Sequence, residues 1–214
     1  MKTLTEEKFS DFYQKWMAEL EELLLSVAKD PPQGSGCAAA IGKLTAHHKE
    51  FYRFKWASAH EDVLAFFCGP VWLSPFETAH LWITGWKPSA AFRLIPAAGL
   101  AAEQVRKIEV LRGRMRVEEG RVEGEMERLQ MAVADRNAVE VVRRGGAEEA
   151  AVGGFLEGLE RVMKLADCVR LKTLKGLLEI LSPMQSVEFL ATNALFQIRV
   201  RKLGMIHERT GLVS

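Results

Sequence analysis

Apolar residues recur at spacings of three and four along almost the whole chain, which is the period of an amphipathic α-helix. The first stripe consists of Phe9, Phe12, Tyr13, Trp16, Leu20, Leu23, Leu24 and Val27. Thr3 and Glu6 have the spacing of an N-terminal capping box, so this helix is expected to begin there. Pro31-Pro32 and the glycines at 34 and 36 should end it, because proline lacks an amide and glycine favours a turn.

A second long helix is expected from about residue 38 to 67, where Gly69-Pro70 stops it. The next start is Ser74-Pro75-Phe76-Glu77, which combines a serine N-cap, a proline at the first helical position and a glutamate that can bond back to the cap. This third helix should be short and end at Thr84-Gly85. Ser89 can cap another short helix that ends before Pro96.

The stretch from about 100 to 144 is rich in Glu, Arg and Met, and apolar residues return at intervals of seven. These are Ile108, Met115, Val122 and Leu129, with Leu111 and Met126 on the same face. The pattern predicts one long, partly exposed helix, or two helices with a bend near Gly120 or Gly124. The apolar face could pack within an antiparallel bundle or form the coiled-coil seam of a homodimer.

Residues 145–154 are rich in Gly, Ala and Glu, and they are expected to form an internal linker or mobile loop. A further amphipathic helix should follow from about Phe155 to Leu181. Ser182 and Gln185 repeat the capping pattern and predict the start of the last helix, which runs to about Leu203 with Gly204 as its C-cap. The fold class is therefore an all-α bundle of about six or seven helices, with one long central helix, in a single domain over 1–214.

Charge and composition exclude several classes of function. The 29 basic side chains nearly balance the 28 acidic ones, for a net charge of +1. That balance argues against direct nucleic-acid binding and against electrostatic docking on a membrane. Three separated cysteines indicate neither a disulfide framework nor a zinc site. The first residues do not resemble a signal peptide, and no apolar run is long enough to span a bilayer.

Several motifs together resemble the Delay of Germination family of plants, a helical domain that also forms the C-terminal part of TGA-type bZIP transcription factors. The most specific stretches are Trp72–Glu77 and Leu81–Ser89. The opening pattern is carried by Phe12, Trp16 and Leu20, and the second by His48, Phe51, Tyr52, Lys55, Asp62, Val63 and Leu64. The late pattern is carried by Ala166, Asp167, Arg170, Thr173, Leu174, Ile180, Leu181, Ser182, Pro183 and Gln185. The resemblance covers most of residues 9–204.

The resemblance implies a non-enzymatic regulator of seed dormancy that acts through protein contacts, in abscisic-acid-linked signalling or transcriptional control. Type 2C protein phosphatases and bZIP factors are the partners that it implies, in the nucleus, the cytoplasm or both. The chain lacks a basic region and zipper before the domain, so it resembles the stand-alone members. Some relatives are linked to haem through a histidine pair; the corresponding positions here hold Gln197 and Arg201, which are not usual haem ligands. We therefore expect no cofactor.

Aromatic residues suggest where a partner or a ligand binds. Trp72, Trp82 and Trp86 lie close together in the chain, and they either form a small core that locks a turn or line a pocket for an apolar ligand or a peptide. The sequence places the partner or ligand surface on this cluster together with the N-terminal helix. Its members are Phe12, Trp16, Trp72, Trp82, Trp86 and Arg93.

Polar residues indicate structure more than chemistry. Asp167 and Arg170 are spaced to pair on one helix, and we interpret them as a structural ion pair. Arg93 is another candidate partner for a buried carboxylate. His47 and Glu50 make one i,i+3 pair without a second ligand pair near them in the sequence, so no metal site is expected. The sequence has no nucleophile elbow, no Cys/His arrangement and no phosphate-binding glycine loop, so no catalytic residue is expected.

Overall fold

A computed structural model describes residues 2–96, 98–133 and 148–211 of the 214-residue chain. Within these ranges the chain is helical and has no strand, which confirms the all-α prediction. The elements are α1 (Leu4–Lys29), α2 (Gly36–Glu61), α3 (Leu64–Phe67), α4 (Pro75–Ala79), the 3₁₀ helix η1 (Pro88–Arg93), α5 (Ala102–Val133), α7 (Glu148–Ile180) and α8 (Pro183–Thr210). None of the described helices is both long enough and apolar enough to cross a membrane.

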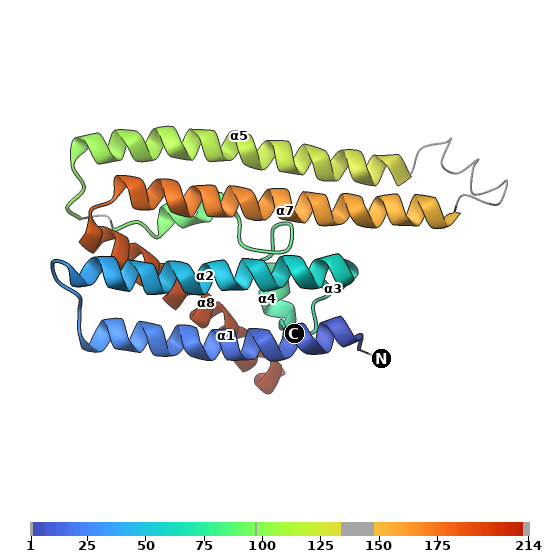
Figure 1. Cartoon of the computed structure of the whole chain (residues 1–214), viewed down its shortest axis with the longest axis horizontal. Coiled ribbons are helices and arrows are strands. Elements are labelled where there is room, and N and C mark those ends of the chain that lie inside the picture. The colour runs from blue at the N-terminus through green and yellow to red at the C-terminus, as the bar shows by residue number, and fades with distance from the viewer. Residues whose placement is uncertain (1, 97, 134–147, 212–214) are drawn as a thin grey trace.

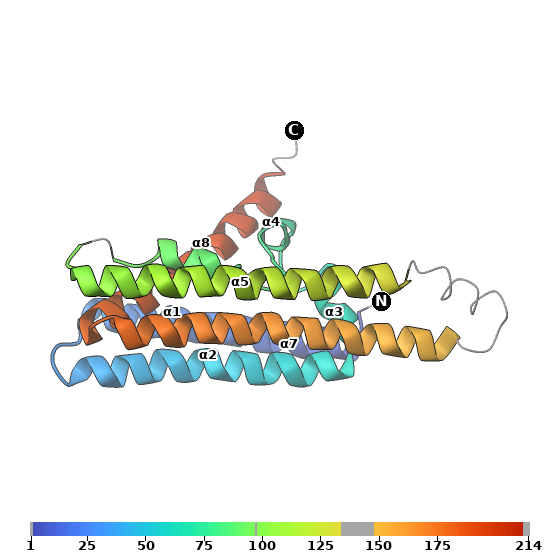
Figure 2. The same ribbon diagram turned by 90° about the horizontal axis from the view of Figure 1, so that it is seen from above.

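Two antiparallel pairs of long helices form the body of the molecule (Figure 1). Helix α1 packs on α2, and α5 packs on α7. Helix α8 contacts both α1 and α2, and its C-terminal half leaves the bundle together with α4, which packs against it (Figure 2). The short elements between α2 and α5 therefore lie where the two pairs and α8 meet.

All three predicted capping boxes are present. Thr3 with Glu6 begins α1, Ser74 with Glu77 begins α4, and Ser182 with Gln185 begins α8. Each cap satisfies amides that have no partner within the helix, and proline follows the last two caps at a position where no amide is needed. These starts depend on a few neighbouring residues, which is why the sequence alone locates them.

The seven-residue apolar repeat of α5 packs against other helices of the same chain. Ile108, Met115 and Val122 are buried in the main core, which also contains Val162 and Leu177 of α7. The single long helix is thus confirmed over 102–133, while residues 134–144 of the expected span lie outside the described residues. This seam is covered by the chain's own α7, so a homodimer built on it is incompatible with the fold; a homodimer through another surface stays a prediction.

Several predicted helix ends are wrong. The second helix stops at Glu61, because the Asp62 carboxylate accepts a hydrogen bond from the Ala65 amide at 3.2 Å and starts the separate helix α3. Helix α4 ends at Ala79 rather than at 84–85. Ser89 is not a cap, since η1 begins at Pro88 and the Ser89 amide instead donates to the Glu119 carboxylate at 2.5 Å.

The last helix continues through Gly204 to Thr210 and is capped by Gly211, whose φ of 56° suits glycine. Gly204 is buried inside it, so the prediction of a C-cap there is wrong. A Cβ on Gly204 would lie 2.0 Å from the Ser74 Oγ. This glycine therefore permits close packing of α8 on the start of α4.

The predicted loop over 145–154 is corrected in part. Residues 145–147 lie outside the described residues, but α7 begins at Glu148 and includes Gly153 and Gly154. Alanine and glutamate favour a helix, and their number here outweighs two glycines that each cost about 1 kcal/mol.

Candidate functional site

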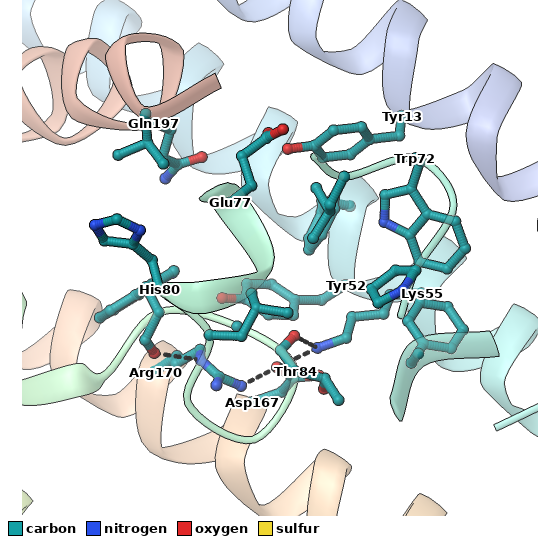
Figure 3. A pocket seen from close by; sticks show the side chains of 18 of the residues that line it. Tyr13, Tyr52, Lys55, Trp72, Glu77, His80, Thr84, Asp167, Arg170 and Gln197 are labelled. Atoms are coloured by element: carbon teal, nitrogen blue, oxygen red, sulfur yellow. Dashed lines mark hydrogen bonds and ion pairs between the residues drawn. The ribbon is translucent and has the colours of Figure 1, made fainter. Parts of the chain in front are cut away.

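A pocket of about 280 Å³ lies among α1, α2, α7, α8 and the segment from α3 to η1. Its size is near the lower end of the roughly 300–1,000 Å³ typical of small-molecule sites. Figure 3 shows that its labelled side chains come from several helices that are far apart in sequence. The aromatic part of its lining is Phe9, Tyr13, Trp16, Phe51, Tyr52, Phe66, Trp72, Trp86 and Phe196.

The outer aromatic wall is built on Phe9, which is only 1% exposed. Its ring centroid lies 4.4 Å from that of Trp72 and 4.8 Å from that of Phe66. Tilted and edge-on arrangements of this kind are favourable for aromatic pairs. The wall joins α1 to the segment after α3, so the pocket exists only when these elements are packed together.

Trp16 forms the next part of the wall and is held by reciprocal contacts with His47. The Trp16 Nε1 donates to the His47 carbonyl at 3.0 Å, and the His47 Nε2 lies 3.0 Å from the Trp16 carbonyl. The two rings stack with centroids 4.7 Å apart and 6° between their planes. Burial lowers the pKa of His47, partly offset by its hydrogen bond to the Trp16 carbonyl.

A buried group of charges closes the other side of the pocket (Figure 3). Asp167 accepts from Lys55 at 2.8 Å, from Arg170 at 2.5 Å and from the Trp56 indole at 2.9 Å. Asp167 and Arg170 therefore form the ion pair that their spacing predicts. Burial lowers the pKa of Lys55 to about 8, against the opposing effect of Asp167.

The same charges hold residues 82–86, which we call the tryptophan loop. Lys55 donates to the Thr84 carbonyl at 3.0 Å, and Arg170 donates to the carbonyls of Trp86 at 2.7 Å and Ile83 at 3.1 Å. Ile83 and Thr84 have positive φ values of 43° and 58°, which residues other than glycine rarely adopt. The buried cations therefore stabilise a strained loop by satisfying its carbonyl groups.

Gly85 is required by the same contact. A Cβ at this position would lie 2.7 Å from the Arg170 Cζ, so any side chain here would have to displace the buried guanidinium from its hydrogen bonds. The guanidinium thus lies directly against the backbone of the tryptophan loop.

A third group fixes α8 over the pocket. Arg201 lies 3.6 Å from the Glu77 carboxylate, stacks over the Tyr13 ring at 5.0 Å and donates to the Trp72 carbonyl at 3.3 Å. Burial, with a smaller effect from Glu77, raises the pKa of Tyr13. Arg201 therefore connects α8 to α4 and α1, while Gln197 lines the pocket. The absence of haem from these two positions stays a prediction.

The residues that the sequence predicted to form one partner or ligand surface do not all lie together in the structure. Trp16, Trp72 and Trp86 line the pocket, and the first two are only 4% and 8% exposed, so they do not form an open partner surface. Trp82 lies outside the pocket lining and donates to Glu123 at 2.8 Å.

Two further members of the predicted surface, Phe12 and Arg93, are not among the residues that line the pocket. Phe12 stacks on Phe54 with centroids 4.0 Å apart. Arg93 is exposed and is not among the pocket-lining residues, while the partners of the buried Asp167 carboxylate are Lys55, Trp56 and Arg170. The prediction that Arg93 pairs with a buried carboxylate is therefore not supported by its position.

Lys55 is the central residue to which sequence reasoning gave no role, although it belongs to the second motif of the family resemblance. It occupies a position in the apolar stripe of α2, and a lysine there is the one signal that it lies in the interior. Its partner Asp167 lies 112 residues away in the chain, so no local pattern connects the two.

The arrangement is suited to binding. The charged groups at the base are occupied by one another and by backbone carbonyls, while most of the lining is aromatic. An apolar molecule or an apolar side chain of a partner would be accommodated by contact area with these rings.

Comparison with known proteins gives a consistent result. The family model described as seed dormancy control matches residues 16–97. The chain is 48% identical to Protein DOG1-like 4 of Arabidopsis thaliana, over 95% of each chain. It is 27% identical to Protein RESPONSE TO ABA AND SALT 1 of Arabidopsis thaliana, over 93% of this chain and 96% of that protein. It is 26% identical to Transcription factor TGA5 of the same plant, over 91% of this chain but 62% of that protein.

Proposed function

This chain belongs to the seed dormancy control family, and on that premise we propose that it is a non-enzymatic plant regulator that works by binding other proteins. Two relatives that it matches over nearly their whole length are named Protein DOG1-like 4 and Protein RESPONSE TO ABA AND SALT 1. These names support a role in abscisic-acid-linked signalling or transcriptional regulation. The proposed partners are type 2C protein phosphatases or bZIP factors, and the proposed location is the nucleus, the cytoplasm or both.

One observation carries the proposal of protein contacts: helix α8 carries large apolar side chains on two opposite sides. One face is buried in the bundle and includes Leu190, Ala194 and Ile198. On the opposite face, the side chains of Leu195, Phe196, Leu203 and Ile206 are between 41% and 55% exposed. At 3.6 residues per turn these four fall within an arc of about 100°.

We call these four residues the outer face of α8. The exposed Glu188 and Arg199 lie within the same arc, so this face is mixed, and its grouped apolar side chains are of the kind that marks an interaction surface. The C-terminal half of α8 leaves the bundle (Figure 2), and this half carries Leu203 and Ile206. A partner that covers the outer face would gain apolar contact of the kind found at the centre of protein interfaces.

Affinity purification of the tagged protein from plant tissue, followed by mass spectrometry, tests this proposal. We expect the double variant Leu195→Glu/Ile206→Glu to capture at least tenfold less of the partner than the unchanged protein does. The control is Val110→Glu on α5, which is 56% exposed and should change nothing. Equal capture by both variants would exclude the outer face of α8 as the contact surface.

The identity of the captured proteins decides among the proposed roles. Type 2C phosphatases support dormancy signalling, and TGA-type factors alone support a co-regulator that reaches DNA through a bZIP partner. If no protein is captured from any tissue, the proposal of protein contacts fails.

A second candidate function is a sensor for an apolar ligand, which the aromatic pocket favours. Its test is mass spectrometry of an organic extract of the natively purified protein. We expect a stoichiometric apolar molecule, and we expect Val200→Trp, which fills part of the pocket lining, to reduce its amount at least tenfold. An extract without such a molecule would contradict this function.

A further inference from the structure

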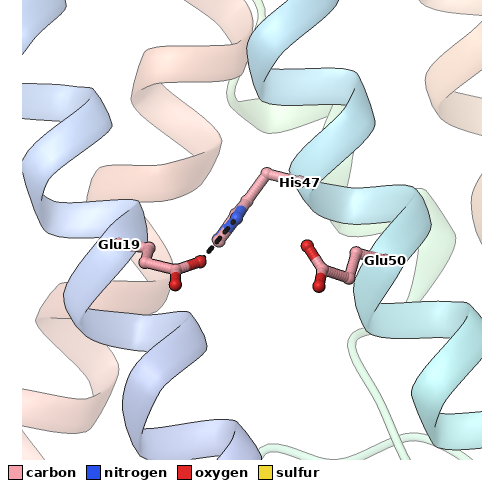
Figure 4. Close-up of side chains that lie close together, drawn as sticks. All are labelled: Glu19, His47 and Glu50. Carbon is pink, nitrogen blue, oxygen red and sulfur yellow. Dashed lines mark ion pairs between the residues drawn. The ribbon is translucent and has the colours of Figure 1, made fainter.

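A second cluster of polar side chains lies at the seam between α1 and α2. Glu19 comes from α1, and His47 and Glu50 come from α2 (Figure 4). One ligand atom from each residue lies within 4.8 Å of the other two. His47 and Glu50 alone made one pair in the sequence, and the fold adds Glu19 as the third member.

The hydrogen bonds of His47 determine which ring nitrogen is free. The Trp16 carbonyl at 3.0 Å can only accept, so Nε2 carries the proton of the neutral ring. Nδ1 then presents a lone pair toward the carboxylates. Its neighbour is the Glu19 carboxylate at 3.8 Å, which is beyond hydrogen-bond distance.

The ring is also fixed in place. The His47 side chain is only 5% exposed, and the stacked Trp16 indole covers one face of it. Histidines that bind metals generally donate their other ring N–H to a carbonyl or a carboxylate, which orients the ligand nitrogen. The carbonyl of Trp16 has that role here.

We propose that Glu19, His47 and Glu50 bind a divalent transition-metal ion, with Zn²⁺ as the best match to one imidazole nitrogen and two carboxylate oxygens. Ligand atoms about 2 Å from a tetrahedral ion lie roughly 3.3 Å apart, so the cluster must contract by about 1.5 Å at most. Both glutamates are exposed and can make this movement while the buried His47 stays in place. Water or a partner's side chain would complete the coordination.

The ion would connect α1 to α2 beside Trp16, which lines the aromatic pocket. Metal binding would therefore stabilise the packing of the N-terminal helix and one wall of the pocket. This inference does not depend on the outer face of α8 or on any protein partner.

Isothermal titration of the chelator-treated full chain with ZnCl₂ tests the site. We expect one ion per chain, and we expect Glu19→Gln/Glu50→Gln to bind at least tenfold more weakly. Both replaced side chains are exposed, so this variant should fold normally. The matched control Glu22→Gln changes another exposed glutamate of α1 and should bind as the unchanged protein does.

Thermal unfolding with and without Zn²⁺ provides the second readout, because an ion that binds only the folded chain raises the melting temperature. We expect this rise in the unchanged protein and in Glu22→Gln, but not in the double variant. Mg²⁺ should produce no comparable rise, since it prefers oxygen ligands.

Three results would overturn the proposal. The first is that Zn²⁺ does not bind. The second is that the double variant binds it as well as the unchanged protein, which would place the ion elsewhere, for example at His60 and Glu160, 3.3 Å apart. The third is that Mg²⁺ raises the melting temperature as much as Zn²⁺ does, which would exclude a role for the imidazole.

Discussion

At the scale of single residues, burial decides which aromatic side chains are structural. Trp16 belongs to a motif that resembles the family pattern, yet it is 4% exposed and packed between His47 and Phe51. Its indole N–H is satisfied by a backbone carbonyl rather than offered to a partner. Trp16 therefore supports the pocket wall.

The substitution Trp16→Ala should consequently destabilise the fold. Removal of a buried tryptophan typically costs about 3–5 kcal/mol, so we expect a large fall in the urea midpoint and not a folded protein that only lacks partner binding. Leu25→Ala is the control on the same helix, because Leu25 is 57% exposed and should shift the midpoint little. A stable Trp16→Ala protein with an unchanged midpoint would contradict this assignment.

At the scale of elements, close packing between helices depends on glycines whose role is invisible in the sequence. Gly204 lies in the interior of α8, where alanine would ordinarily be preferred by about 1 kcal/mol. Its contact with Ser74 reverses that preference, since the added methyl group would overlap the cap of α4.

The pair Gly204→Ala and Gly120→Ala tests this reasoning. Gly204→Ala should lower the free energy of unfolding by about 1–3 kcal/mol through overpacking. Gly120 of α5 has no atom within 4 Å of an added Cβ, so Gly120→Ala should raise it by up to about 1 kcal/mol. Urea unfolding of both variants checks the result; a stabilised Gly204→Ala would mean that α4 moves freely relative to α8.

At the scale of the whole molecule, buried titratable groups predict how stability depends on pH. Burial lowers the pKa of His48 to about 4 and that of Lys55 to about 8, and it raises the pKa values of Tyr13 and Tyr52. The unfolded chain therefore binds more protons than the folded chain between pH 4 and 6.5, owing to His48, and again between pH 8 and 10.5, owing to Lys55. Stability rises with pH in both windows.

Above pH 10 the sign reverses, because the tyrosines ionise in the unfolded chain and stay protonated in the fold. We therefore expect maximal stability near pH 10. The shift of Lys55 from 10.5 to about 8 corresponds to a gain of up to about 3 kcal/mol across its window.

Urea unfolding at pH 7 and pH 9 measures the part of this gain that is reached by pH 9, about 1.4 kcal/mol, and Lys55→Met should remove most of that difference. Val117→Met, at a position of α5 that is 57% exposed, should retain it. An equal rise in Lys55→Met would show that another group is responsible.

The sequence by itself determined the helical class, the three capped helix starts and the long helix over 102–133. Each of these depends on residues within a few positions of one another, where period and cap chemistry act directly. The same locality explains why Asp167 and Arg170 could be paired in advance.

Only the tertiary structure decided what these helices bring together. It placed Lys55 on Asp167, Glu19 beside His47 and Gly204 against Ser74, and it buried the heptad face of α5 on α7. These contacts join residues that are far apart in the chain. They arise from which faces the helices bury, and a periodic pattern states that a face is apolar without stating what covers it.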